Sequence, residues 1–432
     1  MTTPICDFLK YYAESGFLRC HMPAHKGMLN KYDITEIKGA DSLFEANGII
    51  LQSEQNTARL YGTKASFYSA GGSTLCIQAM LTAMKLDGRK ITAVRNAHRA
   101  FVNAAALLNL DVDWILPEYD NGILSGKINP ATVEEHLKNN SRTCLYITSP
   151  DYTGRLADIK TLAEICHKYD APLLVDNAHG AHLAFMPENI HPVALGADIC
   201  CDSMHKMLVG LTGAAVLHTS SEYYAGCLRQ CISMFGSTSP SYLILASLDL
   251  CNKYIAEDIR ADIISNLAYI ADFREKFGFP DYVDGDSFHI TFNTGKSGYN
   301  GNEIADLLRK NNIECEYSDE NLIILLMSPK NTESDYIRLS HAFEKVPDSL
   351  CRRSIHDMPF LTELPEKTLN IGEAVFMPCE EIPVEQSEGR ICASVQVPCP
   401  PAIPIAVSGE IINAECIEIY RRYDIKKVVV IK

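Results

Sequence analysis

Between about residues 60 and 220, apolar strand-like segments alternate regularly with amphipathic helix-like segments. Helical spacing is present in "STLCIQAMLTAMKLDG", "HRAFVNAAALLNLD", "NPATVEEHLKN" and "DIKTLAEICHKYD". Strands are predicted for "KITAVRNAH", "VDWILPEYD", "TCLYITSP", "APLLVDNAHG", "DICCDS" and "GAAVLHTS". This alternation predicts an α/β domain built on a mostly parallel sheet, in which ligands bind beyond the carboxyl ends of the strands.

The remainder of the 432-residue chain changes character twice. Strands such as "NLIILLMSP" mix with helices such as "GNEIADLLRKN" in a section that predicts a smaller α+β domain. A last section is rich in proline, which excludes long helices and central strands, so short strands and turns are expected there. We therefore expect a large domain over 1–275, a small domain over 276–352 and a C-terminal domain over 353–432.

Composition and charge exclude several classes of protein. The formal net charge of -15 and the pI near 5.3 argue against nucleic-acid binding, which needs a basic face. The 16 cysteines are irregularly spaced and form no pair of CxxC units, so we expect reduced thiols and no metal site. The start "MTTPICDFLK" is unlike a signal peptide, and no apolar run is long enough to span a membrane. A cytoplasmic protein is expected.

A lysine and an aspartate follow two of the predicted strands. Lys206 closes "ADICCDSMHK", while Asp176 and His179 follow the strand in "PLLVDNAHGAH". A lysine and a carboxylate at one sheet edge suit pyridoxal phosphate (PLP), whose aldehyde forms a Schiff base with lysine and whose pyridinium nitrogen pairs with a carboxylate. From spacing alone, a salt-bridged pair on two loop ends remains an equal alternative.

A phosphate-bearing cofactor also needs an anion site. Gly71 and Gly72 in "YSAGGST" let the backbone approach an anion, and Ser73 and Thr74 open a predicted helix whose N–H groups favour phosphate. A simple turn and helix cap would have the same sequence. Further candidates near the same edge are two possible phosphate ligands and an imidazole that would stack on a flat ring, namely Ser203, His205 and His98.

These segments, in order, resemble the Orn/Lys/Arg decarboxylase family of fold type I PLP-dependent enzymes. "CHMPAHKG" is similar to the family's "HMPGHKG", "RNAHRA" to "RNCHKS" and "ITSPDYTGRLADI" to "ITSPTYEGVVYDI". "DNAHGAH" resembles "DEAHGAH", "DSMHKML" resembles "STHKTL", and "STSPSY" matches the family segment directly. The resemblance covers nearly the whole chain in family order and implies the short branch that lacks an N-terminal wing domain.

The resemblance implies a role for each candidate. Lys206 is expected to carry the cofactor, Asp176 to pair with the pyridinium, and His98 to stack on the ring, with His179 as a further cofactor contact. Phosphate contacts are expected from Ser73, Thr74, Ser203 and His205. In the family, the "STSPSY" segment reaches the neighbouring subunit, so Ser237 and Thr238 are expected to complete the partner's site in a homodimer. Glu316 resembles an acidic residue near the substrate entrance that would receive the distal cationic group of the substrate, and a structural role is an equal alternative.

The implied reaction is decarboxylation of arginine, lysine or ornithine to the amine and carbon dioxide, as in polyamine biosynthesis. His205 and Lys206 are the candidate proton donors. Alternatives are another PLP reaction, such as transamination or aldol cleavage, and a PLP-binding homologue without activity. The substrate stays open because the chain departs from the family pattern at Ala24, Phe44, Asp151, Asn177 and Ala402.

Overall fold

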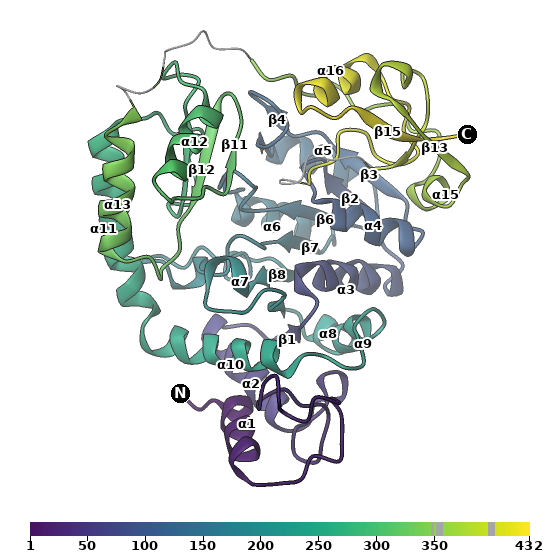
Figure 1. The fold of residues 1–432 in the computed structure, drawn as a ribbon. Coiled ribbons are helices and arrows are strands. Elements are labelled where there is room, and N and C mark those ends of the chain that lie inside the picture. The colour runs from purple at the N-terminus through teal and green to yellow at the C-terminus, as the bar shows by residue number, and fades with distance from the viewer. Residues whose placement is uncertain (347–349, 351–356, 396–401) are drawn as a thin grey trace.

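The computed structural model describes residues 1–346, 350, 357–395 and 402–432 (Figure 1). Within these residues a seven-stranded sheet forms the centre of the large domain. Strand β9 is antiparallel to both of its neighbours, and the strands from β8 to β3 pair in parallel. The predicted α/β sheet is confirmed, in the order β1 (Ala65–Ser69), β9 (Ala215–Thr219), β8 (Ile199–Ser203), β7 (Leu173–Asp176), β6 (Thr143–Thr148), β2 (Lys90–Val94) and β3 (Val112–Ile115).

Helices cover both faces of this sheet, which is why its strands read as continuous apolar runs. Successive residues of a strand face opposite sides. In β6, Cys144 and Tyr146 pack in the same core as α3 and α4, whereas Leu145 and Ile147 pack in the core that contains α5 and α6. The predicted helices are thus confirmed as α3 (Gly72–Leu86), α4 (Arg99–Leu107), α5 (Pro130–Asn139) and α6 (Ile159–Lys168).

The small domain follows two consecutive helices, α10 (Tyr242–Glu257) and α11 (Ile259–Phe277), which lead along one side of the molecule (Figure 1). Its antiparallel sheet has the order β10 (His289–Asn293), β12 (Leu322–Leu326) and β11 (Tyr317–Ser318). The apolar side of this sheet packs in one core with α11, α12 (Gly301–Lys310) and α13 (Glu333–Phe343). The boundary expected at residue 275 falls in the last turn of α11.

The C-terminal section differs from the prediction of strands and turns alone. Its three-stranded sheet has the order β13 (Cys379–Pro383), β15 (Lys427–Ile431) and β14 (Cys392–Ser394). The section also contains α15 (Ile371–Val375) and the nine-residue helix α16 (Ala414–Arg422). The stretch that forms α16 has no proline, and Asn413 caps it by accepting a hydrogen bond from Cys416 N at 2.9 Å. The prediction of short strands and turns, which was based on proline density, was therefore wrong for residues 414–422.

The N-terminal residues pack beneath the large domain through α1 (Pro4–Glu14) and α2 (Ile49–Tyr61), which contact α10 (Figure 1). Between these two helices, several large apolar side chains are exposed, namely Phe17, Leu18, Met22, Met28 and Leu29. The cysteines that the structure describes are all free thiols. None of the described helices is long and apolar enough to cross a lipid bilayer.

Candidate active site

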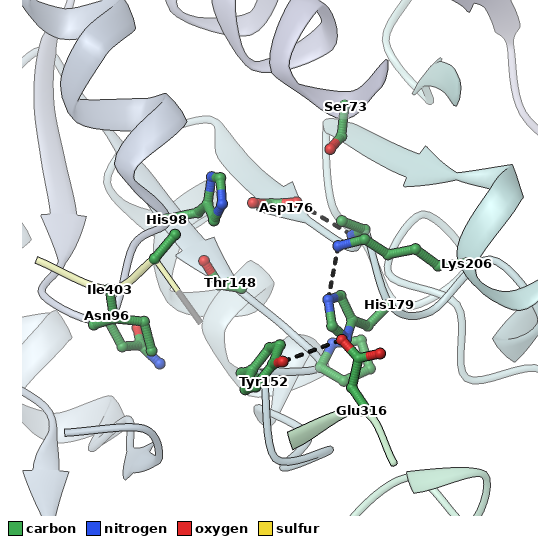
Figure 2. Close-up of a pocket in the computed structure, with 13 residues that line it drawn as sticks. Ser73, Asn96, His98, Thr148, Tyr152, Asp176, His179, Lys206, Glu316 and Ile403 are labelled. Atoms are coloured by element: carbon green, nitrogen blue, oxygen red, sulfur yellow. Dashed lines mark hydrogen bonds between the residues drawn. The ribbon is translucent and has the colours of Figure 1, made fainter. Parts of the chain in front are cut away.

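A pocket opens beyond the carboxyl ends of β2, β6, β7 and β8, at the edge of the sheet where ligands were expected (Figure 2). The small domain and the C-terminal section close its other sides. It brings together six candidates from the sequence, namely Ser73, His98, Asp176, His179, Lys206 and Glu316. Its lining also includes Ala402, which departs from the family pattern, and six residues that sequence reasoning did not single out, namely Asn96, Thr148, Pro150, Tyr152, Ala178 and Ile403.

Lys206 belongs to the single turn α7 (Met204–Met207), which follows β8 directly and points the side chain into the pocket. Its Nζ donates a hydrogen bond to His179 Nε2 at 2.8 Å (Figure 2). Burial lowers the pKa of Lys206, and the nearby Asp176 partly opposes that shift. The pocket therefore favours a less protonated amine than an exposed lysine would offer.

Asp176 ends β7, the strand next to β8, so its carboxylate and Lys206 face the same cavity. Three donors fix the carboxylate: Ala178 N at 3.2 Å and Cys201 Sγ at 3.5 Å to Oδ1, and the Tyr146 hydroxyl at 3.2 Å to Oδ2. A buried, oriented carboxylate of this kind suits the recognition of a protonated ring nitrogen.

His98 is the N-cap of α4, where its Nδ1 accepts a hydrogen bond from Ala100 N at 3.1 Å. The neutral ring therefore carries its proton on Nε2. Burial lowers the pKa of His98, although Asp176 partly opposes this effect. The cap fixes a flat, neutral imidazole beside the pocket, which suits stacking on a cofactor ring.

The start of α3 and the end of β8 supply donors for an anion. Gly72 has a φ of 69°, in the left-handed region that favours glycine, and Ser73 lines the pocket. Ser203 Oγ is buried and has no hydrogen-bond partner among the described residues. A phosphate oxygen would satisfy this hydroxyl, so the site fits PLP on its own geometry. His205 is held differently, because its Nδ1 donates to Ala214 O at 3.0 Å.

Five of the expected cofactor contacts do not line the Lys206 pocket within this single chain: Ser203 and His205 are next to Lys206 in the sequence, whereas Thr74, Ser237 and Thr238 lie elsewhere. Thr74 and Ser237 line a second cavity beside Phe44, and Thr238 is exposed on the same loop. Gly236 packs so closely on the Phe44 ring that a Cβ there would lie 2.2 Å from the ring. This contact fixes the start of the exposed loop.

Three of the departures from the family pattern have local explanations. Ala402 has a φ of 61°, a left-handed backbone conformation that explains a preference for glycine at this position. Asp151 is buried and accepts hydrogen bonds from Ser125 Oγ at 2.7 Å and Thr153 Oγ1 at 2.8 Å, so its role is structural. Asn177 Nδ2 donates to Asp202 Oδ1 at 2.7 Å.

Glu316 approaches the pocket from the small domain, just before β11. Its Oε1 accepts a hydrogen bond from the Tyr152 hydroxyl at 3.1 Å (Figure 2). The Glu316 side chain is exposed, whereas Lys206 and Asp176 lie deep in the same cavity. An acidic group at the mouth attracts a positively charged ligand group.

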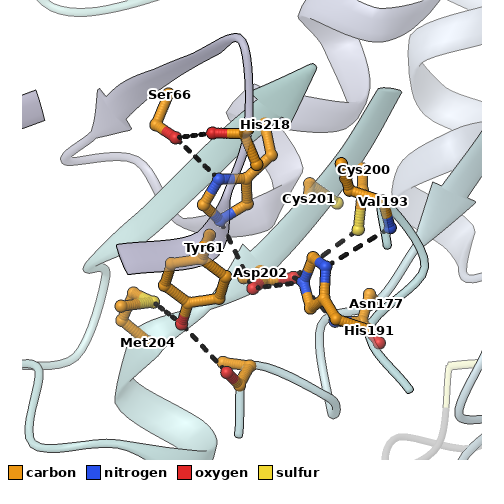
Figure 3. Close-up of polar contacts among 12 residues, drawn as sticks. Tyr61, Ser66, Asn177, His191, Val193, Cys200, Cys201, Asp202, Met204 and His218 are labelled. Atoms are coloured by element: carbon orange, nitrogen blue, oxygen red, sulfur yellow. Dashed lines mark hydrogen bonds and ion pairs between the residues drawn. The ribbon is translucent and has the colours of Figure 1, made fainter. Parts of the chain in front are cut away.

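A buried cluster around Asp202 fixes the end of β8 (Figure 3). Asp202 Oδ2 lies 3.0 Å from His191 Nε2 and 3.4 Å from His218 Nε2. His218 Nδ1 in turn lies 2.8 Å from Ser66 Oγ on β1. Burial opposes ionisation of Asp202, but the two histidines outweigh it and hold its pKa well below the usual range. The cluster therefore connects β8 to β9 through Asp202 and His218, and β9 to β1 through the His218–Ser66 hydrogen bond.

His191, Cys200 and Asp202 lie close enough to be considered as metal ligands. However, His191 Nδ1 accepts a hydrogen bond from Val193 N at 3.3 Å, so the neutral ring carries its proton on Nε2, which faces Asp202. A protonated nitrogen donates and does not coordinate a cation. The geometry is that of a buried carboxylate that accepts hydrogen bonds, and not that of a metal site.

We expect Asp202→Asn to destabilise the protein by about 1–3 kcal/mol, because two buried histidines lose their charged acceptor. The free energy of unfolding in urea measures this loss. The matched control is Glu134→Gln, which breaks the exposed pair with Lys168 and is expected to change stability by about 0.5 kcal/mol or less. Equal stability of both variants would show that the cluster contributes nothing.

Comparisons with known proteins agree with this geometry. A profile of the Orn/Lys/Arg decarboxylase major domain matches residues 25–294, more than half of the chain. A profile of the C-terminal domain of the same family matches residues 358–423. This chain belongs to the Orn/Lys/Arg decarboxylase family. The resemblance stated from the motifs is thereby confirmed.

Relatives match over almost the whole chain. An arginine decarboxylase from Bacillus subtilis is 29% identical over 459 aligned positions, which cover 98% of this chain and 94% of the relative. An arginine decarboxylase from Halalkalibacterium halodurans is also 29% identical, over 95% of this chain and 91% of its own. These family members are similar to this chain in length as well as in sequence.

Solved structures confirm the fold. The lysine decarboxylase LdcF from Francisella novicida superimposes with a TM-score of 0.83 at 19% identity, over 100% of this chain and 81% of its own. A structure of SPT with PLP shares the fold over 72% of this chain and 81% of its own, with a TM-score of 0.57 and 11% identity. Family membership implies PLP as the cofactor.

Proposed function

We propose that this protein removes the α-carboxylate of a basic amino acid, in a PLP-dependent reaction that yields the amine and carbon dioxide. The observation that carries the proposal is one pocket in which Lys206 and Asp176 face each other from adjacent strands while acidic Glu316 lines the mouth. The arginine decarboxylase relatives support a guanidinium- or ammonium-bearing substrate.

Five residues would hold the cofactor in this pocket. Lys206 would bind its aldehyde and Asp176 its ring nitrogen, with His98 stacked on the ring and Ser73 and Ser203 near the phosphate. When bound, PLP supplies an electron sink for the pair of electrons released from the α-carbon. Three hydrogen bonds hold the Asp176 carboxylate in the orientation that this contact needs.

The chain's own side chains create the conditions for loss of a carboxylate. Apolar side chains of Pro150, Ala178 and Ile403 line the pocket and exclude water from part of it. A carboxylate in such surroundings is poorly solvated, which favours its release as neutral carbon dioxide. Lys206, bonded to His179, is better placed than His205 to return a proton, because His205 Nδ1 is engaged with Ala214 O.

The reaction is tested by offering arginine, lysine and ornithine to the PLP-loaded protein. Carbon dioxide and the corresponding amine are expected from at least one of them, with arginine as the first substrate to test. A keto acid without carbon dioxide would show transamination, and an aldehyde product would show aldol cleavage. A protein that binds PLP through Lys206 but converts no amino acid would be a non-catalytic homologue.

Glu316 is proposed to bind the distal cationic group of the substrate. We expect Glu316→Gln to raise KM by about tenfold or more with little change in kcat, because a charge-assisted hydrogen bond of about 1.5–3 kcal/mol is lost away from the reacting carbon. Steady-state kinetics with the preferred substrate measure both constants.

The matched control is Glu314→Gln. Glu314 lies two residues earlier on the same segment, but its carboxylate pairs with Arg309 on the surface. Its substitution is expected to leave KM unchanged. If both variants behave alike, Glu316 does not bind the substrate.

A homodimer with shared sites is proposed from the loop that contains Ser237 and Thr238. Thr74 and Ser237 line a cavity separate from Lys206, so this loop is free to reach a second copy. The exposed apolar side chains between α1 and α2 support a buried subunit contact. The same proposal includes domain boundaries at residues 275 and 352, a cytoplasmic location and a role in polyamine formation.

A further inference from the structure

A chain of hydrogen bonds leads from Lys206 into the small domain. Lys206 Nζ lies 2.8 Å from His179 Nε2, and His179 Nδ1 lies 3.2 Å from His289 Nε2. His289 Nδ1 then lies 2.7 Å from Asp286 Oδ2. Lys206 and His179 belong to the large domain, whereas His289 begins β10 and Asp286 precedes it. The path therefore joins the two domains at the pocket.

Asp286 is an ionised anchor at the far end of this chain. It is fully enclosed and accepts hydrogen bonds on Oδ1 from His182 Nε2 at 2.9 Å and from Phe288 N at 3.3 Å. His182 Nδ1 has no hydrogen-bond partner among the described residues, so the contact of His182 with this carboxylate is made by Nε2 alone. Burial opposes ionisation of Asp286, but His182 and His289 outweigh it and keep its pKa well below the usual range.

The carboxylate determines which nitrogen of each ring carries a proton. Because Asp286 accepts, His289 Nδ1 must donate, which leaves its Nε2 bare when the ring is neutral. His289 Nε2 then accepts from His179 Nδ1, so His179 Nε2 is bare as well. His179 consequently presents a base to Lys206.

We propose that His179, His289 and Asp286 form a relay that removes a proton from Lys206. The Nζ–H bond of the Lys206 ammonium breaks as an N–H bond forms at His179 Nε2. At the same time the N–H bond at His179 Nδ1 breaks and one forms at His289 Nε2. His289 becomes an imidazolium held against Asp286, and Lys206 is left as a neutral amine.

The geometry favours this transfer because the positive charge moves next to a buried anion. The charge leaves the pocket, where burial penalises the Lys206 ammonium, and is then paired with Asp286. Only the neutral amine of Lys206 attacks an aldehyde or takes up a new proton. The relay therefore serves the decarboxylation proposed above, and its purpose rests on that proposed function. His179 contacts the reacting amine, and His289 and Asp286 act as positioning residues.

Other titratable and charged groups also face the relay, from β7, β8, α4, α11 and the segment before β11. None of them lies between Lys206 and Asp286 along the hydrogen-bonded path. These groups are Asp176, Cys201, His98, Arg274 and Glu316. None of them is substituted in the experiment below.

The test measures the protonation of Lys206 without relying on catalysis. The full chain is freed of carbonyl cofactor with hydroxylamine and labelled with trace acetic anhydride over a range of pH. Peptide mass spectrometry then quantifies Lys206, and exposed Lys310 in the same digest corrects for reagent. His289→Asn and Asp286→Asn are each expected to raise the labelling midpoint of Lys206 by about one pH unit or more, because the proton is no longer withdrawn.

The sign of the shift separates a relay from a static contact. If His179 merely accepts a hydrogen bond from the ammonium, breaking the chain would remove that support and lower the midpoint. His179→Asn interrupts the path inside the pocket, where lost volume is tolerated, and tests the same upward shift if the buried variants fail to fold. A lowered or unchanged midpoint in a folded variant overturns the relay.

His182→Gln is the matched control. It changes the other histidine on the same carboxylate but lies outside the path to Lys206. In this variant the labelling midpoint of Lys206 is expected to stay within about 0.3 pH units of its value in the unmodified chain. An upward shift equal to that of His289→Asn would overturn the proposal. Because labelling needs neither PLP nor substrate, a failed decarboxylation assay leaves this result readable.

Discussion

Lys206→Ala is expected to lower kcat by more than about 10³-fold, as removal of a covalent catalyst does in other enzymes. The substitution leaves the pocket without an amine that can bind the cofactor aldehyde. It is also expected to remove the visible absorbance band of lysine-bound PLP. Absorbance spectra and single-turnover rates after loading with PLP measure the two losses separately.

Lys206→Arg is the control for charge. Arginine keeps a cation opposite Asp176 but stays protonated and forms no Schiff base under these conditions. Both variants should therefore lose the band, whereas their melting temperatures should differ if the cation stabilises the buried carboxylate. A visible band retained in Lys206→Ala would place the cofactor on another lysine and would contradict the assignment.

Much of the fold was predictable because the strands and helices of the large domain alternate within short distances of the sequence. The ends of β7 and β8 are adjacent in the parallel sheet, so Asp176 and Lys206 were expected at one edge. The segment "DICCDS" was predicted to form a strand with reduced thiols. In β8, Cys200 and Cys201 are buried on opposite faces as free thiols.

The rest of the site depends on contacts between distant segments. His289 and Asp286 reach His179 because β10 folds against the loop after β7, and no local pattern marks that approach. Tyr152 and Thr148 lie in "ITSPDY". The end of the predicted strand in this segment was the available sign that these residues would lie near the site. Ile403 enters the pocket from the C-terminal domain. The helix α16 was missed because proline density describes a whole section and not each stretch within it.

A buried ion pair links the C-terminal domain to the end of β2, beside the active site. Arg95, directly after β2, donates from Nη1 to Glu410 Oε1 at 3.0 Å and from Nη2 to Glu410 Oε2 at 2.6 Å. Its Nη2 also donates to Ile405 O at 3.0 Å. Nearby, Arg99 N donates to Ala402 O at 2.9 Å, and Ala402 lines the pocket. Arg95 thus holds the segment that closes the pocket.

Glu410→Ala is expected to destabilise the protein by about 3–5 kcal/mol, because the Arg95 guanidinium is fully buried and would keep an unpaired charge. It is also expected to lower kcat/KM in protein that remains folded, since residues 402 and 403 lose their fixed position. Urea unfolding followed by circular dichroism measures the first effect, and steady-state kinetics below the transition measure the second.

Lys367→Ala supplies the comparison that makes this result specific. Lys367 pairs with Asp111 and also joins the C-terminal section to the large domain, but the two side chains are 36% and 58% exposed. Water already solvates both charges, so its loss is expected to cost about 1 kcal/mol or less. If Glu410→Ala destabilises the protein no more than Lys367→Ala does, the buried Arg95–Glu410 pair is no more stabilising than an exposed pair. The C-terminal domain would then be held by its apolar core, and the pocket would close without this ion pair.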